Sequence, residues 1–227
     1  MKLSIIIPAY NEENTILNVL KAVKKVRLSA EKEIIVIDDC SKDGTKGILE
    51  KINDKEIKVY FHKTNKGKGA AIRTGLKQAT GEFVIIQDAD LEYDPEEFKL
   101  LIEEARRRKA KAVYGSRFKG KNKRSYFSYY FGNIFLSFLT SILYFSRISD
   151  METCYKFVER KLLLSLNLKA NKFDIEPEIT AKLLKKGIKI YEIPISYKPR
   201  SIKQGKKIRW RDGFYAILTL LRYRFSN

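Results

Sequence analysis

The first half of the chain alternates short, mainly apolar runs with segments of helical periodicity. The apolar runs are Leu3–Pro8, Glu33–Ile37, Ile57–Phe61, Glu82–Gln87 and Ala110–Tyr114. Because these runs lack an exposed polar face, helices must cover both sides of the strands, which predicts an α/β fold with a mainly parallel, Rossmann-like sheet. In sheets of this kind, ligands bind beyond the carboxyl ends of the strands.

Polar and turn-forming residues follow four of the predicted strands. The segments are Ala9–Glu12, Asp38-Asp39, Asp88–Asp90 and Gly115–Arg117. Parallel strands end at the same edge of a sheet, so these segments are expected to meet there and form a binding site. Asn11 is also expected to cap the first helix.

Two carboxylates at a spacing of two, Asp88 and Asp90, directly follow an apolar strand. At a strand end, side chains at this spacing can point to the same side. Carboxylate oxygens are ligands for Mg²⁺ or Mn²⁺, hard cations that also take phosphate oxygens. The pair therefore predicts a metal site for a phosphorylated ligand, with a solvated acidic turn as the alternative.

Two further segments are candidates for nucleotide contacts. Asp38 or Asp39 can accept hydrogen bonds from a nucleobase or a ribose hydroxyl, or can cap the next helix. Residues 65–71 are glycine-rich and basic, include Lys66, and lead into a helix, a pattern that suits phosphate. The spacing is not that of a P-loop, so this second signal is weak alone.

The chain carries a formal net charge of +19, which predicts anionic partners: nucleic acid, phosphorylated metabolites or an anionic membrane. Ten basic and no acidic residues lie in Arg106–Arg124, and seven basic residues lie in Lys198–Arg211. A nucleic-acid-binding module is one interpretation. The basic stretches do not interleave with aromatic residues at the strand ends, however, so nucleic acid is not the expected partner.

Cysteine and histidine usage narrows the chemistry. The chain has two cysteines, Cys40 and Cys154, and one histidine, His62, with no CxxC pair. This argues against a zinc site and against a Cys–His nucleophile. The usage fits a reducing compartment, so we expect a cytoplasmic protein.

An uncharged segment of 22 residues separates Arg124 from Arg147. On a helix, one narrow face would carry its large apolar side chains: Phe127, Phe131, Ile134, Phe135, Phe138, Ile142 and Phe145. Such a stripe with basic flanks predicts a helix lying on an anionic membrane surface, as a peripheral contact. A helix packed on the core or on a second copy, and a membrane span, are the alternatives. Phe214–Phe225 is a second candidate interfacial helix, or a core helix.

Together the motifs resemble the inverting glycosyltransferases with a GT-A fold, in particular the dolichyl-phosphate mannose or glucose synthase branch. The resemblance covers residues 3–120 specifically and, less specifically, nearly the whole chain. The matching stretches are Ser4–Glu13, Ile35–Thr45, Asn65–Gly69, Asp88–Asp90 and Gly115–Arg117, followed by Asp150–Lys156, Glu176–Glu178 and Glu192–Ile195.

The resemblance implies a role for most of the candidate residues. Pro8, Ala9, Tyr10 and Glu12 would line the nucleotide pocket, and Asp38 or Asp39 would touch the base or ribose. The segment Asp88-Ala89-Asp90 would hold the metal and the donor diphosphate. Arg117 and Arg200 are similar to arginines that grip donor and acceptor phosphates. The implied architecture is a single domain, 1–227, with a nucleotide-sugar half (1–120) and an acceptor and membrane half (121–227).

The expected acceptor is a polyprenyl or dolichyl phosphate, and the expected donor a nucleotide sugar of the GDP-mannose or UDP-glucose type. A lipid phosphate is already anionic and needs cationic residues, whereas a hydroxyl acceptor needs a general base. Asp150 is the candidate base for a hydroxyl, or a partner for Arg147. A saccharide or glycolipid hydroxyl as acceptor, and a nucleotidyltransferase, remain rival interpretations. A membrane subunit or a second copy is a candidate partner.

Overall fold

A computed structural model describes residues 1–120, 122, 127–200 and 210–226. The strands are β1 (Lys2–Ala9), β2 (Glu31–Asp38), β3 (Ile57–Phe61), β4 (Phe83–Ile86), β5 (Ala112–Ser116), β6 (Lys156–Glu159) and β7 (Tyr191–Pro194). The helices are α1 (Ile16–Lys25), α2 (Thr45–Glu50), α3 (Lys68–Gln78), α4 (Phe98–Arg108), α5 (Phe127–Leu143), α6 (Arg160–Ser165), α7 (Ile175–Lys185) and α8 (Trp210–Phe225), with a 3₁₀ turn η1 (Pro95–Glu97) before α4.

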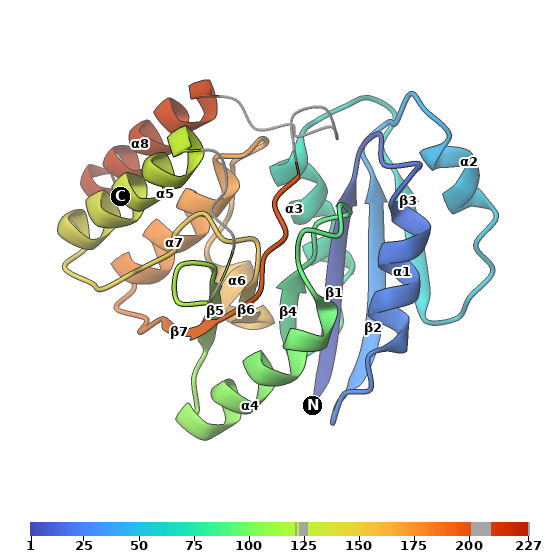
Figure 1. Ribbon diagram of the computed structural model, residues 1–227, viewed down its shortest axis with the longest axis horizontal. Coiled ribbons are helices and arrows are strands. Elements are labelled where there is room, and N and C mark those ends of the chain that lie inside the picture. Colours follow the sequence, from blue (N-terminus) through green and yellow to red (C-terminus); the bar gives the residue numbers. More distant parts are fainter. Residues whose placement is uncertain (121, 123–126, 201–209, 227) are drawn as a thin grey trace.

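One seven-stranded sheet runs through the molecule in the order β3-β2-β1-β4-β6-β5-β7 (Figure 1). β6 is antiparallel to both of its neighbours, and the other pairs are parallel. The predicted mainly parallel α/β sheet is therefore confirmed, and the five strands predicted in the first half of the chain are present. β6 was not predicted. Strands from both sides of residue 120 belong to this one sheet, so the sheet does not mark a boundary at that residue. The division into two functional halves therefore stays a prediction.

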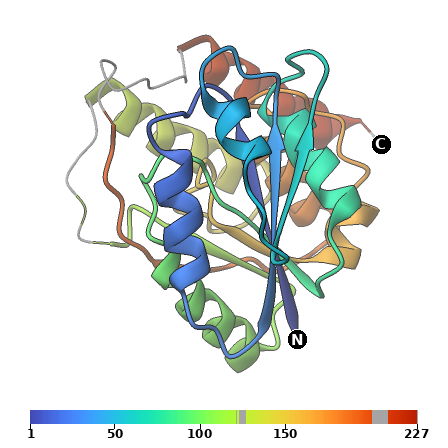
Figure 2. The same cartoon turned by 90° about the vertical axis from the view of Figure 1, so that its right-hand side faces the viewer.

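Helices cover both faces of the sheet, and α1 and α3 lie on opposite sides of it (Figure 2). The central strands are buried on both faces: Ile5, Ile6 and Ile7 of β1 are fully buried beside their β2 partners. Burying such side chains stabilises the fold by roughly 1.5–3 kcal/mol each. This apolar centre fixes the carboxyl ends of β1, β2 and β4 at one edge.

The loop after β1 differs from the prediction. Asn11 does not cap α1, which begins after Thr15 without a side-chain cap. Asn11 instead has a left-handed backbone (φ 51°), and its Oδ1 accepts a hydrogen bond from the Lys42 amide at 2.8 Å. The residue therefore ties the loop after β1 to the loop after β2, where both strands end.

A buried carboxylate at the start of β2 contributes stability that depends on pH. Glu33 Oε1 accepts hydrogen bonds from Ser4 Oγ (2.7 Å) and from the Thr80 amide (2.7 Å) and hydroxyl (2.8 Å). Burial raises the pKa of Glu33, but these hydrogen bonds and Lys58 outweigh it and lower the pKa to about 2. The ionised carboxylate therefore stabilises the fold fully above the unfolded pKa of about 4.5, and the stabilisation is lost as pH falls towards 2.

We expect Glu33→Gln to lower the free energy of unfolding by about 2 kcal/mol at pH 7, since charged hydrogen bonds are lost. Urea denaturation at pH 7 and pH 3 should give a smaller difference from the wild type at pH 3. Glu50→Gln is the control, because Glu50 is exposed and pairs with the exposed Lys46. An equal loss for Glu33→Gln at both pH values would contradict this account.

Candidate functional site

The acidic pair after β4 is held by two cationic side chains from distant parts of the chain. Lys68 Nζ lies 2.8 Å from Asp88 Oδ1 and 2.7 Å from Glu176 Oε1. Arg200 Nη2 donates to Asp90 Oδ2 at 2.9 Å. Each carboxylate of the pair therefore has its own positively charged partner. Acidic and basic side chains alternate at the edge of the sheet where the parallel strands end.

These contacts set the protonation of the two carboxylates apart. Burial disfavours the charged form of Asp88, but the Lys68 ammonium outweighs it and lowers the pKa of Asp88. Burial, followed by the charges of Asp88 and Glu92, raises the pKa of Asp90 to about 7, against the opposing effect of Arg200. Asp88 is thus ionised at neutral pH, whereas Asp90 is about half ionised.

Glu12 connects the loop after β1 to this acidic pair. Its carboxylate accepts from Arg200 Nη1 at 3.1 Å and from Nη2 at 3.3 Å. Thr15 Oγ1 lies 2.7 Å from both Glu12 Oε2 and the Ala89 carbonyl oxygen, and its single proton serves one at a time. The structure therefore brings together Glu12, Asp90 and Arg200, which the resemblance had assigned separately.

The two aspartates after β2 have different surroundings. Asp39 Oδ1 lies 2.6 Å from His62 Nδ1 and accepts from the Lys66 amide at 2.9 Å, while Oδ2 accepts from the Gly67 amide at 2.7 Å. Both oxygens of Asp39 therefore hold the loop that precedes α3.

Asp38 retains an unused acceptor. It is fully buried, its Oδ2 accepts from the Ser41 amide at 3.2 Å, and its Oδ1 has no hydrogen-bonding partner in the described part of the chain. Neither aspartate caps α2, which begins at Thr45 after Gly44, so the capping alternative is wrong.

Pro8, Ala9 and Tyr10 complete the end of β1 beside these aspartates. Ala9 is buried, and its carbonyl accepts from the Asp39 amide at 2.8 Å, whereas Pro8 and Tyr10 are half-buried. The structure therefore places the predicted nucleotide-pocket residues next to the unused oxygen of Asp38. Their contact with a nucleotide stays a prediction.

The glycine-rich loop before α3 is shaped by close packing. Gly67 has a left-handed backbone (φ 92°), and a Cβ there would lie 2.4 Å from the Asn171 carbonyl oxygen. A Cβ at Gly69 would lie 2.5 Å from the Ala170 carbonyl oxygen. No side chain fits at either position, which lets the loop deliver Lys68 to the acidic pair.

The amides of this loop are less available to phosphate than its sequence indicates. Those of Lys66 and Gly67 donate to Asp39, and that of Ala70 donates to the Asn171 carbonyl at 3.1 Å. The Lys66 side chain is exposed, and its predicted contact with the donor stays a prediction.

Arg117 and Asp150 form a buried ion pair at the same edge of the sheet as the acidic pair. Asp150 is fully buried; its Oδ2 accepts from the amide and Nε of Arg117 at 2.8 Å each, and its Oδ1 accepts from Nη2 at 2.7 Å. The predicted partner of Asp150, Arg147, was therefore wrong. Since Arg117 engages both carboxylate oxygens, the arrangement orients the guanidinium.

The long basic stretch Arg106–Arg124 is divided by β5. Arg107 and Arg108 at the end of α4 bond Glu104, and Arg106 bonds Ser29, so these arginines lie at the opposite end of the sheet. Only the part from Arg117 onward follows the carboxyl end of β5. The stretch thus does not form one phosphate-binding surface. Residues 201–209 of the second basic stretch lie outside the described residues.

Asp88 and Asp90 suit a divalent cation by chemistry, since both offer carboxylate oxygens at one strand end. Among the described residues, no group of three His, Cys, Asp or Glu side chains is placed to hold a metal. The pair therefore fits a cation that takes its remaining ligands from a diphosphate and water. Sequence reasoning included Lys68 only in the glycine-rich segment assigned to phosphate, and Glu176 only in a stretch that matched the family. It did not predict that the two residues meet at the acidic pair.

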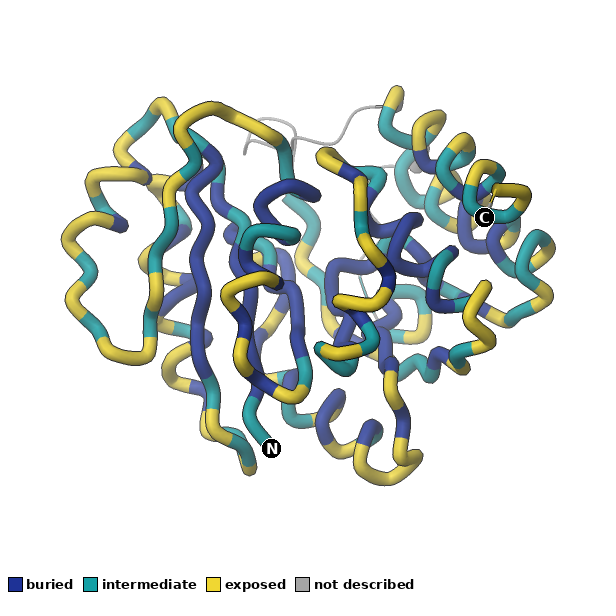
Figure 3. Tube along the Cα trace, turned by 180° about the vertical axis from the view of Figure 1, so that it is seen from behind, coloured by how far each residue is buried: buried dark blue, intermediate teal, exposed yellow. Residues whose placement is uncertain are grey.

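A separate apolar surface covers α5 and α8, which pack side by side (Figures 1 and 3). We call it the α5–α8 surface; its exposed members are Phe131, Ile134, Phe135, Phe138, Ile142, Phe145, Phe214, Leu218 and Phe225. The predicted stripe on one face of α5 is therefore confirmed from Phe131 to Ile142 and points to solvent, whereas Phe145 lies beyond the end of the helix. The side chain of Phe127, the remaining predicted member, lies outside the described residues.

Two hydroxyl residues in the middle of α5 face inward. Thr140 is fully buried and donates to the Leu136 carbonyl at 2.7 Å, while Ser137 is 3% exposed and accepts from the Met151 amide at 3.0 Å. The helix thus turns Phe131, Phe135 and Phe138 outward and these two hydroxyls inward. Across the described part of the chain, no helix has the length and apolar character that a membrane span needs.

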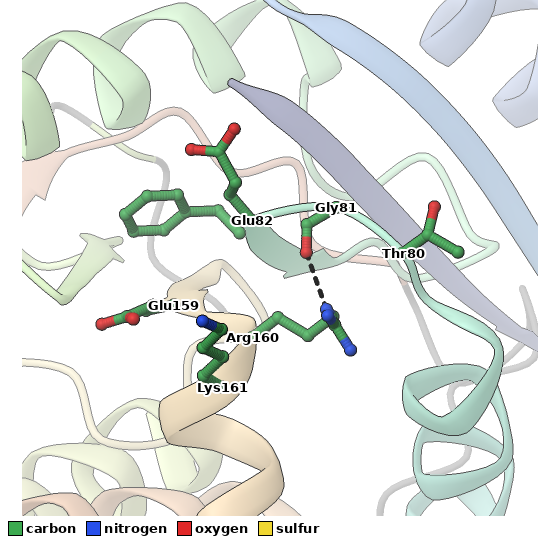
Figure 4. A pocket seen from close by; sticks show the side chains of 7 residues that line it. Thr80, Gly81, Glu82, Glu159, Arg160 and Lys161 are labelled. Carbon is green, nitrogen blue, oxygen red and sulfur yellow. Dashed lines mark hydrogen bonds between the residues drawn. The ribbon is translucent and has the colours of Figure 1, made fainter.

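A cavity of about 250 Å³ lies elsewhere, between the start of β4 and the end of β6 (Figure 4). Arg160 Nε donates to the Gly81 carbonyl at 2.8 Å in this cavity. Its lining residues are Thr80, Gly81, Glu82, Phe83, Glu159, Arg160 and Lys161. Because β4 enters the sheet here and the acidic pair follows its other end, the cavity is separate from the candidate site.

Comparison with known proteins places this arrangement in a family. The family described as Glycosyl transferase family 2 matches residues 4–166 of this chain. An uncharacterized protein of Methanocaldococcus jannaschii is 34% identical over 206 residues, covering 84% of this chain and 86% of that protein. A UDP-N-acetylglucosamine–dolichyl-phosphate N-acetylglucosaminyltransferase of Methanococcus voltae is 29% identical over 246 residues, covering 98% of this chain and 96% of that protein.

A solved structure agrees in fold. Glucosyl-3-phosphoglycerate synthase of Mycobacterium tuberculosis, in complex with Mn²⁺, UDP and glucosyl-3-phosphoglycerate, superposes with a TM-score of 0.71 at 18% identity. The match covers 98% of this chain and 79% of that one. With these matches the predicted GT-A fold is confirmed, and the nucleotidyltransferase alternative is not supported. The chain belongs to glycosyl transferase family 2 and is a glycosyltransferase with a GT-A fold.

Proposed function

We propose that this chain transfers a hexose or N-acetylhexosamine from a nucleoside diphosphate sugar to a polyprenyl phosphate, with inversion at the anomeric carbon. One observation carries the proposal: the acidic pair and the Arg117–Asp150 pair lie at the same sheet edge, the first suited to a metal-bound diphosphate and the second to a phosphate acceptor. The name of the Methanococcus voltae relative supports this donor and acceptor class.

The donor would lie across the ends of β1, β2 and β4. Asp38 supplies the unused acceptor for a base N–H or a ribose hydroxyl, with Pro8, Ala9 and Tyr10 lining the pocket. Asp88 and Asp90 would hold Mg²⁺ or Mn²⁺ together with the diphosphate oxygens. When bound, the cation neutralises charge on the departing nucleoside diphosphate.

Lys68 and Arg200 supply the remaining positive charge for the donor. Both contact the acidic pair, so their N–H groups lie where the diphosphate oxygens of the donor would be held. Preorganised donors of this kind stabilise charge that develops as the leaving group departs.

The acceptor proposal rests on Arg117. Asp150 holds its guanidinium through two oxygens, which leaves Asp150 occupied as a positioning residue. A phosphate acceptor needs no base, because its oxygen is already anionic, and Arg binds phosphate well. The phosphate oxygen would attack the anomeric carbon as the bond to the nucleoside diphosphate breaks.

A screen for nucleoside diphosphate release tests the proposed function. The purified chain is mixed with UDP-N-acetylglucosamine, UDP-glucose or GDP-mannose, each with Mg²⁺ or Mn²⁺, with and without a polyprenyl phosphate. We expect release from one donor only when the lipid phosphate is present. Release that requires a saccharide hydroxyl instead would overturn the acceptor assignment and favour the rival glycosyltransferase.

The α5–α8 surface supports a peripheral position on the membrane that carries such an acceptor. Phe118, next to Arg117, makes an edge contact with Tyr130 of α5 at 5.4 Å, so the acceptor arginine is joined to this surface. At its far side the Arg224 guanidinium lies 5.6 Å from the Phe145 ring. Apolar side chains beside cations match the acyl chains and headgroups of an anionic membrane.

We expect the double variant Phe135→Ser, Phe138→Ser to bind anionic vesicles at least about tenfold more weakly, since each buried Phe contributes about 1 kcal/mol or more. Cosedimentation with phosphatidylglycerol vesicles measures the affinity. Leu100→Ser on α4, exposed to a similar degree, is the control. Unchanged vesicle binding, or a wild-type dimer that dissociates in the variant, would contradict the membrane contact and indicate a second copy as the partner.

A further inference from the structure

Two buried carboxyl oxygens near the acidic pair take no part in the donor and acceptor contacts proposed for this chain. Glu176, in the first turn of α7, is 3% exposed; its Oε1 bonds Lys68, and its Oε2 has no hydrogen-bonding partner among the described residues. Glu152, in the turn before β6, has an Oε1 that is equally closed to solvent and unpartnered. A buried unsatisfied group costs about 1–3 kcal/mol, so two together call for a ligand that satisfies them.

The two carboxyl groups are linked to both halves of the candidate site, Glu176 by an ion pair and Glu152 by electrostatic interactions. Lys68 bridges Glu176 directly to Asp88. Burial, and next the charge of Glu176, raises the pKa of Glu152 to about 8, and Arg117 is among the charges that act on Glu152 in the opposite direction. Glu152 is therefore within electrostatic range of both Glu176 and the Arg117–Asp150 pair.

The chemistry of this position excludes several ligands. An ionised phosphate or carboxylate has no hydrogen to donate to these oxygens, and an apolar group would likewise leave them unsatisfied. A neutral ligand rich in hydroxyls meets this requirement, because each O–H can donate to a carboxyl oxygen. In the proposed reaction, the sugar ring is the neutral part of the substrates, and it lies between the diphosphate and the acceptor phosphate.

We propose that Glu152 and Glu176 form the subsite for the donor's sugar ring and accept hydrogen bonds from its hydroxyl groups through Glu152 Oε1 and Glu176 Oε2. This inference rests on the proposed function. It assigns sugar recognition to two residues, while Asp38 and Asp88 serve the nucleotide. A site built to bond a hydroxyl discriminates strongly against an analogue that lacks it, since its buried oxygens then stay unpaired.

Binding measurements test the subsite without relying on turnover. Calorimetry compares the nucleoside diphosphate with the nucleotide sugar that the donor screen identifies, for wild type, Glu152→Gln and Glu176→Gln. We expect each variant to bind the nucleotide sugar about tenfold more weakly or worse, but the nucleoside diphosphate within about twofold of wild type. Gln keeps an oxygen that can accept from Lys68, and Glu82→Gln at the other end of the sheet is the control.

Deoxy analogues of the donor sharpen the test. Wild type should bind the analogue that lacks the contacted hydroxyl as weakly as a Gln variant binds the intact donor, and the variant should no longer distinguish the two. Equal loss of nucleoside diphosphate and nucleotide sugar, or a fall in kcat with unchanged donor affinity, would overturn the subsite. Intact subsite behaviour with no transfer to lipid phosphate would contradict only the acceptor, whereas wild type that binds no nucleotide sugar would contradict both proposals.

Discussion

Replacing Asp88 or Asp90 by Asn is expected to lower kcat/KM for sugar transfer by about a thousandfold, the largest effect of any single change in this chain. Asn would remove the negative charge that the proposed divalent cation needs, and with it the neutralisation that this cation would give the leaving diphosphate. Loss at Asp88 also leaves Lys68 with Glu176 as its remaining ion-pair partner. Steady-state release of nucleoside diphosphate at several Mn²⁺ concentrations measures the effect.

A matched control separates this loss from general damage. Asp94→Asn makes the same change four residues beyond Asp90, at an exposed residue whose side chain accepts from the Glu96 amide. Asn is an equally good cap, so activity should stay within about twofold of wild type. Near-normal turnover by Asp88→Asn or Asp90→Asn, with an unchanged thermal midpoint, would contradict the metal role.

The second large effect is expected at Arg117. Arg117→Lys keeps the charge but loses the planar fork that Asp150 orients, so kcat/KM for the lipid phosphate should fall by about a hundredfold. The donor's affinity should stay within about twofold of wild type, because Arg117 is assigned to the acceptor. Initial rates at varied lipid phosphate, with calorimetry of the donor, measure both quantities.

Arg117→Lys also disturbs a buried ion pair, and the loss of stability reaches about 3–5 kcal/mol when one partner of such a pair is removed. A control variant is therefore needed. Arg160→Lys makes the same change at an arginine that bonds a backbone carbonyl at the opposite end of the sheet. It should leave acceptor kinetics unchanged. A parallel loss of donor and acceptor binding in Arg117→Lys would show a structural role for the pair instead of acceptor binding.

The sheet was predictable because its signal is local. The apolar composition of runs such as Leu3–Pro8 predicts strands that are buried on both faces of the sheet. The residues that follow each run must then meet at one edge of the sheet. The same logic placed Asp88 and Asp90 together. β6 escaped prediction because its four residues, Lys156–Glu159, contain two charged side chains and resemble no buried strand.

The partners of the site residues could not be read from the sequence. Lys68 meets Glu176, and Arg117 meets Asp150, through contacts made only when distant segments pack together. A single basic residue and a single acidic residue, far apart in the sequence, do not indicate that they will form an ion pair. For the same reason the sequence counted Arg107 and Arg117 in one basic stretch, although β5 carries them to opposite ends of the sheet.

The most direct test of the central claim is to identify the lipid product. The chain, its donor, Mn²⁺ and a polyprenyl phosphate are incubated, and the lipid extract is analysed by mass spectrometry. We predict a polyprenyl phosphate that has gained one sugar residue, formed in equal amount to the released nucleoside diphosphate. Nucleoside diphosphate release with an unmodified lipid phosphate, and the sugar found on a hydroxyl or in water, would contradict the account.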